Sequence, residues 1–258
     1  MLKTNTDKIL CIGCSHASKT YATKSWPYWI GQFYKKDVEV MSSSAAGVQI
    51  GVDKLCLKLV SKTYDSIFFQ VPNNIRLSIG MNSNGIKRNP EMSMPWERNG
   101  NTVGEEFLIN LNPNNNVESM KKFFGKADEK IFEAFNKWYL KYFGDNTYET
   151  NVRLMHNIFL VQELCKVNNI PYYIFFWHDV PVKTDNSKLF NAWHDLIDWN
   201  RIVTGSVTGF LEHNKYKNKS IIPNEWSVDG YHMNDLGSRL VVDNFVIPGV
   251  QKIKQGAN

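Results

Sequence analysis

The chain has 258 residues, of which 43% are hydrophobic, 21% charged and 13% aromatic, and its formal net charge is +5. These proportions are those of an ordinary globular protein, and one α/β domain of this length can bury a large core. The lysines are scattered among acidic residues, so we expect no nucleic-acid partner. No run approaches the ~18 apolar residues of a membrane span. The apolar run at 9–12 is too short for a signal peptide, so we expect a cytoplasmic or virion-associated protein.

Short continuous apolar runs indicate the buried strands of a parallel sheet. We expect strands at 8–12, 38–41, 66–71 and 172–177, and a weaker fifth at 220–222. Helical patterns lie between or after them, at 25–36, 47–62, 127–143, 151–167 and 234–246. Strands that alternate with helices indicate an α/β fold, a three-layer α/β/α sandwich with a mainly parallel sheet of about five strands.

Residues 80–125 interrupt this alternation. The segment is rich in Asn, Gly and Pro and has neither a helical nor a strand period. A loop of this length in a compact domain is usually a functional loop or a disordered one. We therefore expect a single domain over 1–258 with a long insertion or lid loop at about 80–125. Trp96, inside it, is either a contact for substrate or an aromatic anchor that pins the loop to the surface.

Three reactive side chains follow the first expected strand, in the run Gly13-Cys14-Ser15-His16. A residue in this turn lies at the carboxyl edge of the sheet, where open α/β sheets bind ligands. A serine is a poor nucleophile unless a base stands next to it and a third group orients that base. Asp229 and His232, three residues apart before the last expected helix, can supply both. In such a turn the carboxylate reaches Nδ1 and leaves Nε2 facing a serine.

Cys14 is the rival nucleophile, because a thiol is more nucleophilic than a hydroxyl at neutral pH. Strand alternation points Cys14 away from Ser15, and we expect a buried structural thiol. Cys11 and Cys14 are three residues apart, but a strand puts them on opposite faces, which weakens that pairing, and we expect free thiols. A nucleophile elbow of the form G-x-S-x-G is excluded, because Ala17 stands at its second glycine. The sequence also lacks the glycine-rich loops that hold phosphates or dinucleotides.

Four blocks of the sequence together resemble the SGNH/GDSL hydrolase family, and the resemblance runs through most of the chain. Gly13-Cys14-Ser15 stands where the family has G-D-S, with Trp26-Pro27 opening the next helix. Gly47 follows the second strand, and Asn74, or Asn73 if the register shifts by one, follows the third. Asp229-Gly230-Tyr231-His232 matches the closing D-x-x-H. Cys14 in place of Asp and Pro72 in place of Gly depart from the family pattern.

The resemblance implies a flavodoxin-like SGNH fold and a serine esterase that uses no cofactor. Ser15 would be the nucleophile, His232 the base and Asp229 the acid that orients it. The backbone N–H groups of Ser15 and Gly47, with the side chain of Asn74 or Asn73, would form the oxyanion hole.

The substrate that the resemblance implies is a small acyl ester, acetyl-like, on a carbohydrate or related metabolite. A lipid or thioester acylhydrolase is the alternative within the enzyme class. An inactive carbohydrate-binding or virion-associated module is the alternative outside it. The sequence gives no indication of oligomeric state.

The remaining histidines divide into two groups. His16 adjoins Ser15, and His178 follows the strand at 172–177, so each is a possible substrate contact, although His16 could equally satisfy local backbone groups. His156, His194 and His213 lie in helical or loop settings that indicate structural or solvated side chains. No His and carboxylate spacing fits a metal site, so we expect no metal.

Overall fold

A computed structural model describes residues 4–19, 22–42, 47–72, 77–82, 106–111, 130, 133–134, 137–138, 141, 148–183, 187–213, 224–229 and 232–256.

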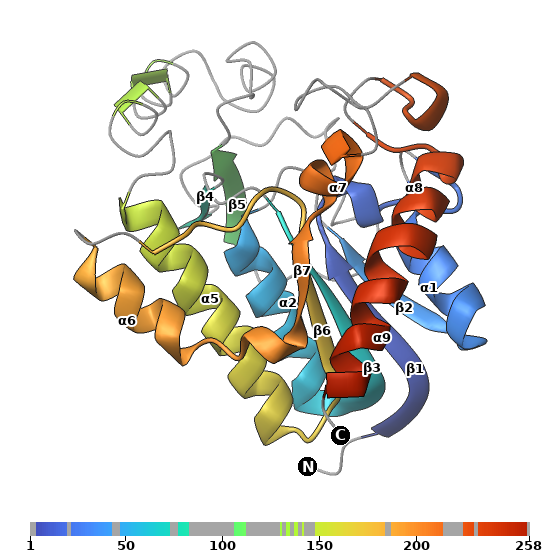
Figure 1. The fold of residues 1–258 in the computed structure, drawn as a ribbon. Coiled ribbons are helices and arrows are strands. Elements are labelled where there is room, and N and C mark those ends of the chain that lie inside the picture. The colour runs from blue at the N-terminus through green and yellow to red at the C-terminus, as the bar shows by residue number, and fades with distance from the viewer. Residues whose placement is uncertain are drawn as a thin grey trace.

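The centre of the molecule is a sheet of five parallel strands in the order β2-β1-β3-β6-β7 (Figure 1). Its strands are β1 (Thr4–Gly13), β2 (Val38–Ser42), β3 (Lys62–Val71), β6 (Tyr172–Phe176) and β7 (Ile202–Ser206). This order is that of the flavodoxin-like doubly wound sheet, in which ligands bind beyond the carboxyl ends of the strands. The expected α/β fold with a mainly parallel sheet is therefore confirmed.

Helices cover both faces of the sheet and make three layers. They are α1 (Trp26–Tyr34), α2 (Val48–Ser61), α5 (Tyr148–Val167), α6 (Lys188–Leu196), α7 (Val207–His213), α8 (Asp235–Val241) and α9 (Ile247–Gly256). A π-helical turn, Val242–Val246, joins α8 to α9. In Figure 1, α2, α5 and α6 lie on one side of the sheet and α1, α8 and α9 on the other.

Alternation along the strands divides the core into two clusters. Leu10 and Ile12 of β1 pack with α2, α5 and α6, whereas Ile9 and Cys11 pack with α1, α7, α8 and α9. The apolar runs of the inner strands β1, β3 and β6 are buried on both faces, which is why they are continuous rather than alternating. Phe68 of β3 is fully buried, and burial of a side chain of this size contributes roughly 2–3 kcal/mol.

The prediction missed the fifth strand of this sheet. We expected it at 220–222, which lies outside the described residues, whereas β7 is formed by the sequence IVTGS. Thr204 and Gly205 are exposed, and Gly205 has φ +88°. A short edge strand interrupted by a left-handed glycine carries too little apolar periodicity to be recognised.

The expected insertion at 80–125 lies mostly outside the described residues. Its described part is the end of β4 (Leu77–Asn82) and the whole of β5 (Glu106–Leu111), which pair as a two-stranded antiparallel sheet. That the intervening residues form a lid stays a prediction.

The helices predicted at 25–36, 47–62 and 151–167 correspond to α1, α2 and α5. The few described residues within 127–143 are helical. The helix expected at 234–246 continues through the π-helical turn to Gly256, and α6 and α7 were not predicted. Among the described residues, no helix combines the length and the apolar character that crossing a bilayer requires.

Candidate active site

Ser15 lies just beyond the carboxyl end of β1, in a single 3-10 turn, Ser15–Ala17. The turn is closed by the backbone bonds Ala17 N to Cys14 O and Ser18 N to Ser15 O, both 3.0 Å. Ser25 occupies the N-cap position of α1, but its hydroxyl donates to Ala17 O (3.0 Å) instead of capping the helix. The turn that presents Ser15 is therefore fastened to the start of α1.

His232 and Asp229 form the turn that precedes α8. The Asp229 carboxylate bonds His232 twice: Oδ1 accepts from the backbone N–H and Oδ2 lies 2.7 Å from ring Nδ1. The other ring nitrogen, Nε2, lies 3.1 Å from Ser15 Oγ. Ser15 and His232 are 217 residues apart in sequence, and the structure brings all three candidate side chains into one hydrogen-bonded chain.

The turn is held by bonds on both sides of His232. Val228 N donates to His232 O (3.0 Å), and Asn234 N donates to Trp226 O (2.8 Å). The Asn234 side chain then caps α8 by accepting from Gly237 N (2.9 Å). A Cβ on Gly237 would lie 2.5 Å from Trp226 O, so only glycine lets α8 start this close to the turn.

A second set of bonds joins the two distant parts of the chain. Asp235, at the start of α8, accepts from the Thr23 hydroxyl (2.8 Å) and from Lys24 N (2.9 Å). The Lys24 bond and the Thr23 bond lower the pKa of Asp235 below its ordinary value, although burial opposes them. The loop after Ser15 is thereby tied to the helix that follows His232.

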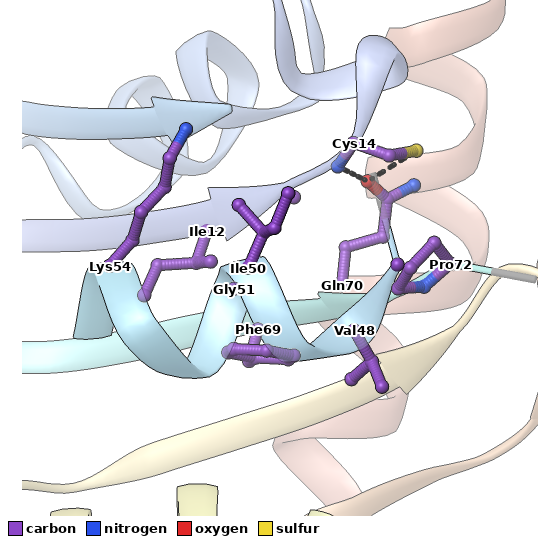
Figure 2. A pocket seen from close by; sticks show the side chains of 11 residues that line it. Ile12, Cys14, Val48, Ile50, Gly51, Lys54, Phe69, Gln70 and Pro72 are labelled. Atoms are coloured by element: carbon purple, nitrogen blue, oxygen red, sulfur yellow. Dashed lines mark hydrogen bonds between the residues drawn. The ribbon is translucent and has the colours of Figure 1, made fainter. Parts of the chain in front are cut away.

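The structure places Cys14 away from this chain of hydrogen bonds. The residue is 2% exposed, and its thiol lies 3.5 Å from Gln70 Oε1 at the end of β3 (Figure 2). All four cysteines are free, and Cys11, Cys14 and Cys165 are buried. This agrees with a structural role for Cys14.

Of the predicted oxyanion donors, the structure describes Ser15 and Gly47 only. Gly47 is the N-cap residue of α2 and is buried. It shares with Cys14 and Gln70 the lining of a cavity of about 10 Å³ (Figure 2), room for about one water molecule. Asn73 and Asn74 lie outside the described residues.

Lys54 lines the same cavity further along α2. Its Nζ donates to Ser42 O (2.6 Å), at the end of β2. Burial lowers the pKa of Lys54 to about 8, because removal from water disfavours the charged form.

His16 is buried beside the triad rather than open to solvent. Its ring stacks on Trp177, with centroids 3.5 Å apart and planes at 17°, and lies 5.3 Å from the His232 ring. His178 follows Trp177 at the carboxyl edge of the sheet and is partly buried. Trp96 lies outside the described residues.

Two residues at the site were not singled out from the sequence, Trp177 and Gln70. A glutamine inside the apolar run SIFFQV was a usable signal, because a buried amide needs hydrogen-bond partners. Trp177 carried no comparable signal, since an aromatic residue at the end of a buried strand usually belongs to the core. His156 and His194, expected to be structural, pack on Trp193 and Trp199.

The described residues contain no group of three or more His, Cys, Asp or Glu that could hold a metal ion. The arrangement places a hydroxyl within hydrogen-bond reach of an imidazole whose other ring nitrogen meets a carboxylate. Groups in this order are able to perform nucleophilic acyl transfer.

No protein-family model matches the sequence, and no curated protein does. Solved structures do match. An acetyl xylan esterase is 13% identical, with 92% of this chain and 96% of that chain covered and a TM-score of 0.45. A GDSL-like lipase from Bacteroides thetaiotaomicron is 9% identical, with 95% and 88% covered and a TM-score of 0.39. A two-domain esterase active on acetylated mannans is 14% identical, with 97% and 50% covered and a TM-score of 0.42.

These matches have identities of 14% or less and TM-scores below 0.5, so they carry no conclusion about function. The arrangement of Ser15, His232 and Asp229 is independent of them.

Proposed function

We propose that the protein is a serine esterase that removes a small acyl group, of acetyl size, from a carbohydrate or related metabolite. The observation that carries the proposal is the continuous contact from Asp229 through His232 to Ser15, with distances of 2.7 and 3.1 Å. Those distances lie within hydrogen-bond reach, which a nucleophile and its base require.

In the proposed reaction, Ser15 Oγ attacks the ester carbonyl while His232 Nε2 takes its proton. Asp229 holds the proton on Nδ1 and stabilises the imidazolium. His232 then gives the proton to the departing alcohol, and an acyl group remains on Ser15. A water molecule, activated by His232 in the same way, releases the acid and restores the serine.

The negative charge on the carbonyl oxygen needs donors already in place. Ser15 N and Gly47 N are the proposed donors among the described residues, with the side chain of Asn74 or Asn73 as the third. Each such donor is worth ~3–4 kcal/mol in the transition state. Gly47 is the N-cap of the 14-residue helix α2, whose N-terminal dipole favours negative charge at the same place.

The small size of the acyl group comes from the family resemblance. The carbohydrate or metabolite portion of the substrate comes from the family resemblance and from the names of the similar structures.

The proposal is tested by hydrolysis of p-nitrophenyl esters by the wild type, Ser15→Ala and Cys14→Ala. We expect the wild type and Cys14→Ala to turn over p-nitrophenyl acetate and Ser15→Ala to fall to the buffer rate. Equal background rates for the wild type and Ser15→Ala would exclude the esterase. A strong preference for butyrate or longer esters would exclude small-acyl specificity and favour a lipid acylhydrolase.

A further inference from the structure

Gln70 is the one amide side chain within the buried part of β3. It is 1% exposed and lies among Phe68, Phe69 and Val71, which are buried as well. Its Oε1 accepts from Cys14 N (3.2 Å) and lies 3.5 Å from the Cys14 thiol, so it reaches from the third strand to the end of the first (Figure 2).

The orientation of this amide is fixed by its partner. Cys14 N carries a hydrogen and can only donate, so the atom of Gln70 that faces it must be the oxygen. Nε2 is then directed elsewhere, is buried, and has no hydrogen-bond partner among the residues that the structure describes. An apolar side chain at this position would leave the buried N–H of Cys14 without its acceptor, and a buried donor without a partner is costly. The amide therefore ties β3 to the residue that precedes Ser15.

The amide also fills the space behind the turn. A Cβ on Gly13 would lie 2.6 Å from Gln70 Oε1 and 2.9 Å from the Ala17 Cβ. Only a glycine before Cys14 lets the turn and the amide approach this closely. The absence of a side chain at Gly13 thus leaves the space in which Gln70 Oε1 reaches the backbone N–H of Cys14.

The consequence concerns the peptide group that joins Cys14 to Ser15. Gln70 fixes Cys14 on its N–H side, and Ala17 N fixes Cys14 on its carbonyl side (3.0 Å). With both ends of Cys14 held, the plane of the Cys14–Ser15 peptide has little freedom. That plane sets the direction of Ser15 N–H, the proposed oxyanion donor, and of the Ser15 side chain toward His232.

We propose that Gln70 is a positioning residue, which holds the Cys14–Ser15 peptide so that the Ser15 N–H and hydroxyl point at the reacting ester. This inference rests on the proposed esterase activity. Gln70 does not touch Ser15 Oγ or His232, and it acts through the backbone of Cys14. Its removal should therefore slow the chemical step and leave substrate binding nearly unchanged.

The test substitutes Gln70 by Met, which keeps its length and removes the acceptor. A displaced nucleophile of this kind costs ~10- to 100-fold in rate. We expect kcat for p-nitrophenyl acetate to fall by that factor with KM within about twofold, the pattern of a lost transition-state interaction. Labelling of Ser15 by a fluorophosphonate should slow by a similar factor. Gln70→Asn, too short to reach Cys14 N, should show the same loss and replaces the Met variant if that variant does not fold.

Gln162 is the matched control. It is also fully buried, and its amide makes two bonds to the backbone of Asp198, accepting from N (2.9 Å) and donating to O (3.0 Å). Asp198 precedes β7, an edge strand that β3 and β6 separate from β1, whereas Ser15 follows the carboxyl end of β1. Gln162→Met should lower the melting temperature and leave kcat within about twofold of the wild type.

Two results would overturn the inference: wild-type kcat in a folded Gln70→Met or Gln70→Asn variant, or an equal loss of kcat in Gln162→Met. Failure of the proposed function is a different result, because the wild type itself would then neither hydrolyse the ester nor react with the fluorophosphonate.

Discussion

Asp229→Asn tests the role of the carboxylate more sharply than its deletion does. In the structure one carboxylate oxygen accepts from His232 N and the other meets Nδ1, both at 2.7 Å. The backbone N–H can only donate, so the single oxygen of an Asn must remain there. The Asn amide nitrogen is then forced against Nδ1 and donates to it. His232 consequently carries its proton on Nε2, the nitrogen that faces Ser15, and cannot accept the serine proton.

The expected loss is large although the turn keeps its shape. A wrong imidazole tautomer in a Ser-His-Asp triad costs ~10⁴-fold in kcat, which corresponds to about 5.4 kcal/mol of transition-state stabilisation. We expect kcat/KM for p-nitrophenyl acetate to fall by this factor, and the Asn variant to be no more active than Asp229→Ala. The melting temperature should stay closer to wild type for Asn than for Ala.

Asp243→Asn is the control for this experiment. Asp243 makes an exposed ion pair with Arg239 (3.2 Å) on the same C-terminal helical segment, and such pairs contribute little. Its kcat/KM should match the wild type. A loss of less than tenfold in Asp229→Asn would refute the assignment of His232 as a base oriented by Asp229.

Two further predictions concern stability. Gly237→Ala would bring a Cβ to 2.5 Å from Trp226 O, whereas a Cβ on Gly256 meets nothing within 4 Å. Thermal melting should therefore show a loss of ~1–3 kcal/mol for Gly237→Ala and none for Gly256→Ala. An equal loss of stability in the two variants would contradict the close packing of Gly237 against Trp226 O. The second prediction follows from the pKa of Lys54, about 8 when folded against 10.5 ordinarily. Between these values the unfolded chain binds more protons, so stability rises with pH. In urea titrations from pH 8 to 10.5, the free energy of unfolding of the wild type should rise relative to that of Lys54→Met. The rise should be up to about 1.4 kcal/mol per pH unit. A constant difference would mean that Lys54 has an ordinary pKa.

The strands could be predicted where burial on both faces produces a continuous run of apolar residues. β1, β3 and β6 contain continuous apolar runs because helices cover them on both faces. β7 could not be found in this way, because it is an edge strand of five residues with a left-handed glycine and two exposed positions. The order of the strands needed tertiary information, although alternation with helices indicated that they are parallel.

The part of the candidate site that belongs to sequence motifs could be predicted. Ser15, Asp229 and His232 were found because their spacing to strand and helix ends is a local property of the chain. Gln70 was missed because its partner, the backbone N–H of Cys14, lies 56 residues away, and no local pattern encodes that pairing. The burial of His16 against Trp177 depends in the same way on the adjacency of two segments far apart in sequence.

The central claim is that Ser15 is the nucleophile of an acyl transfer. It is tested most directly by treating the protein with a fluorophosphonate and mapping the adduct by peptide mass spectrometry. We predict one adduct per chain, on Ser15, with none on Cys14, and no labelling of Ser15→Ala or of protein unfolded in urea. An adduct on Cys14, or undiminished labelling of Ser15→Ala, would contradict the account.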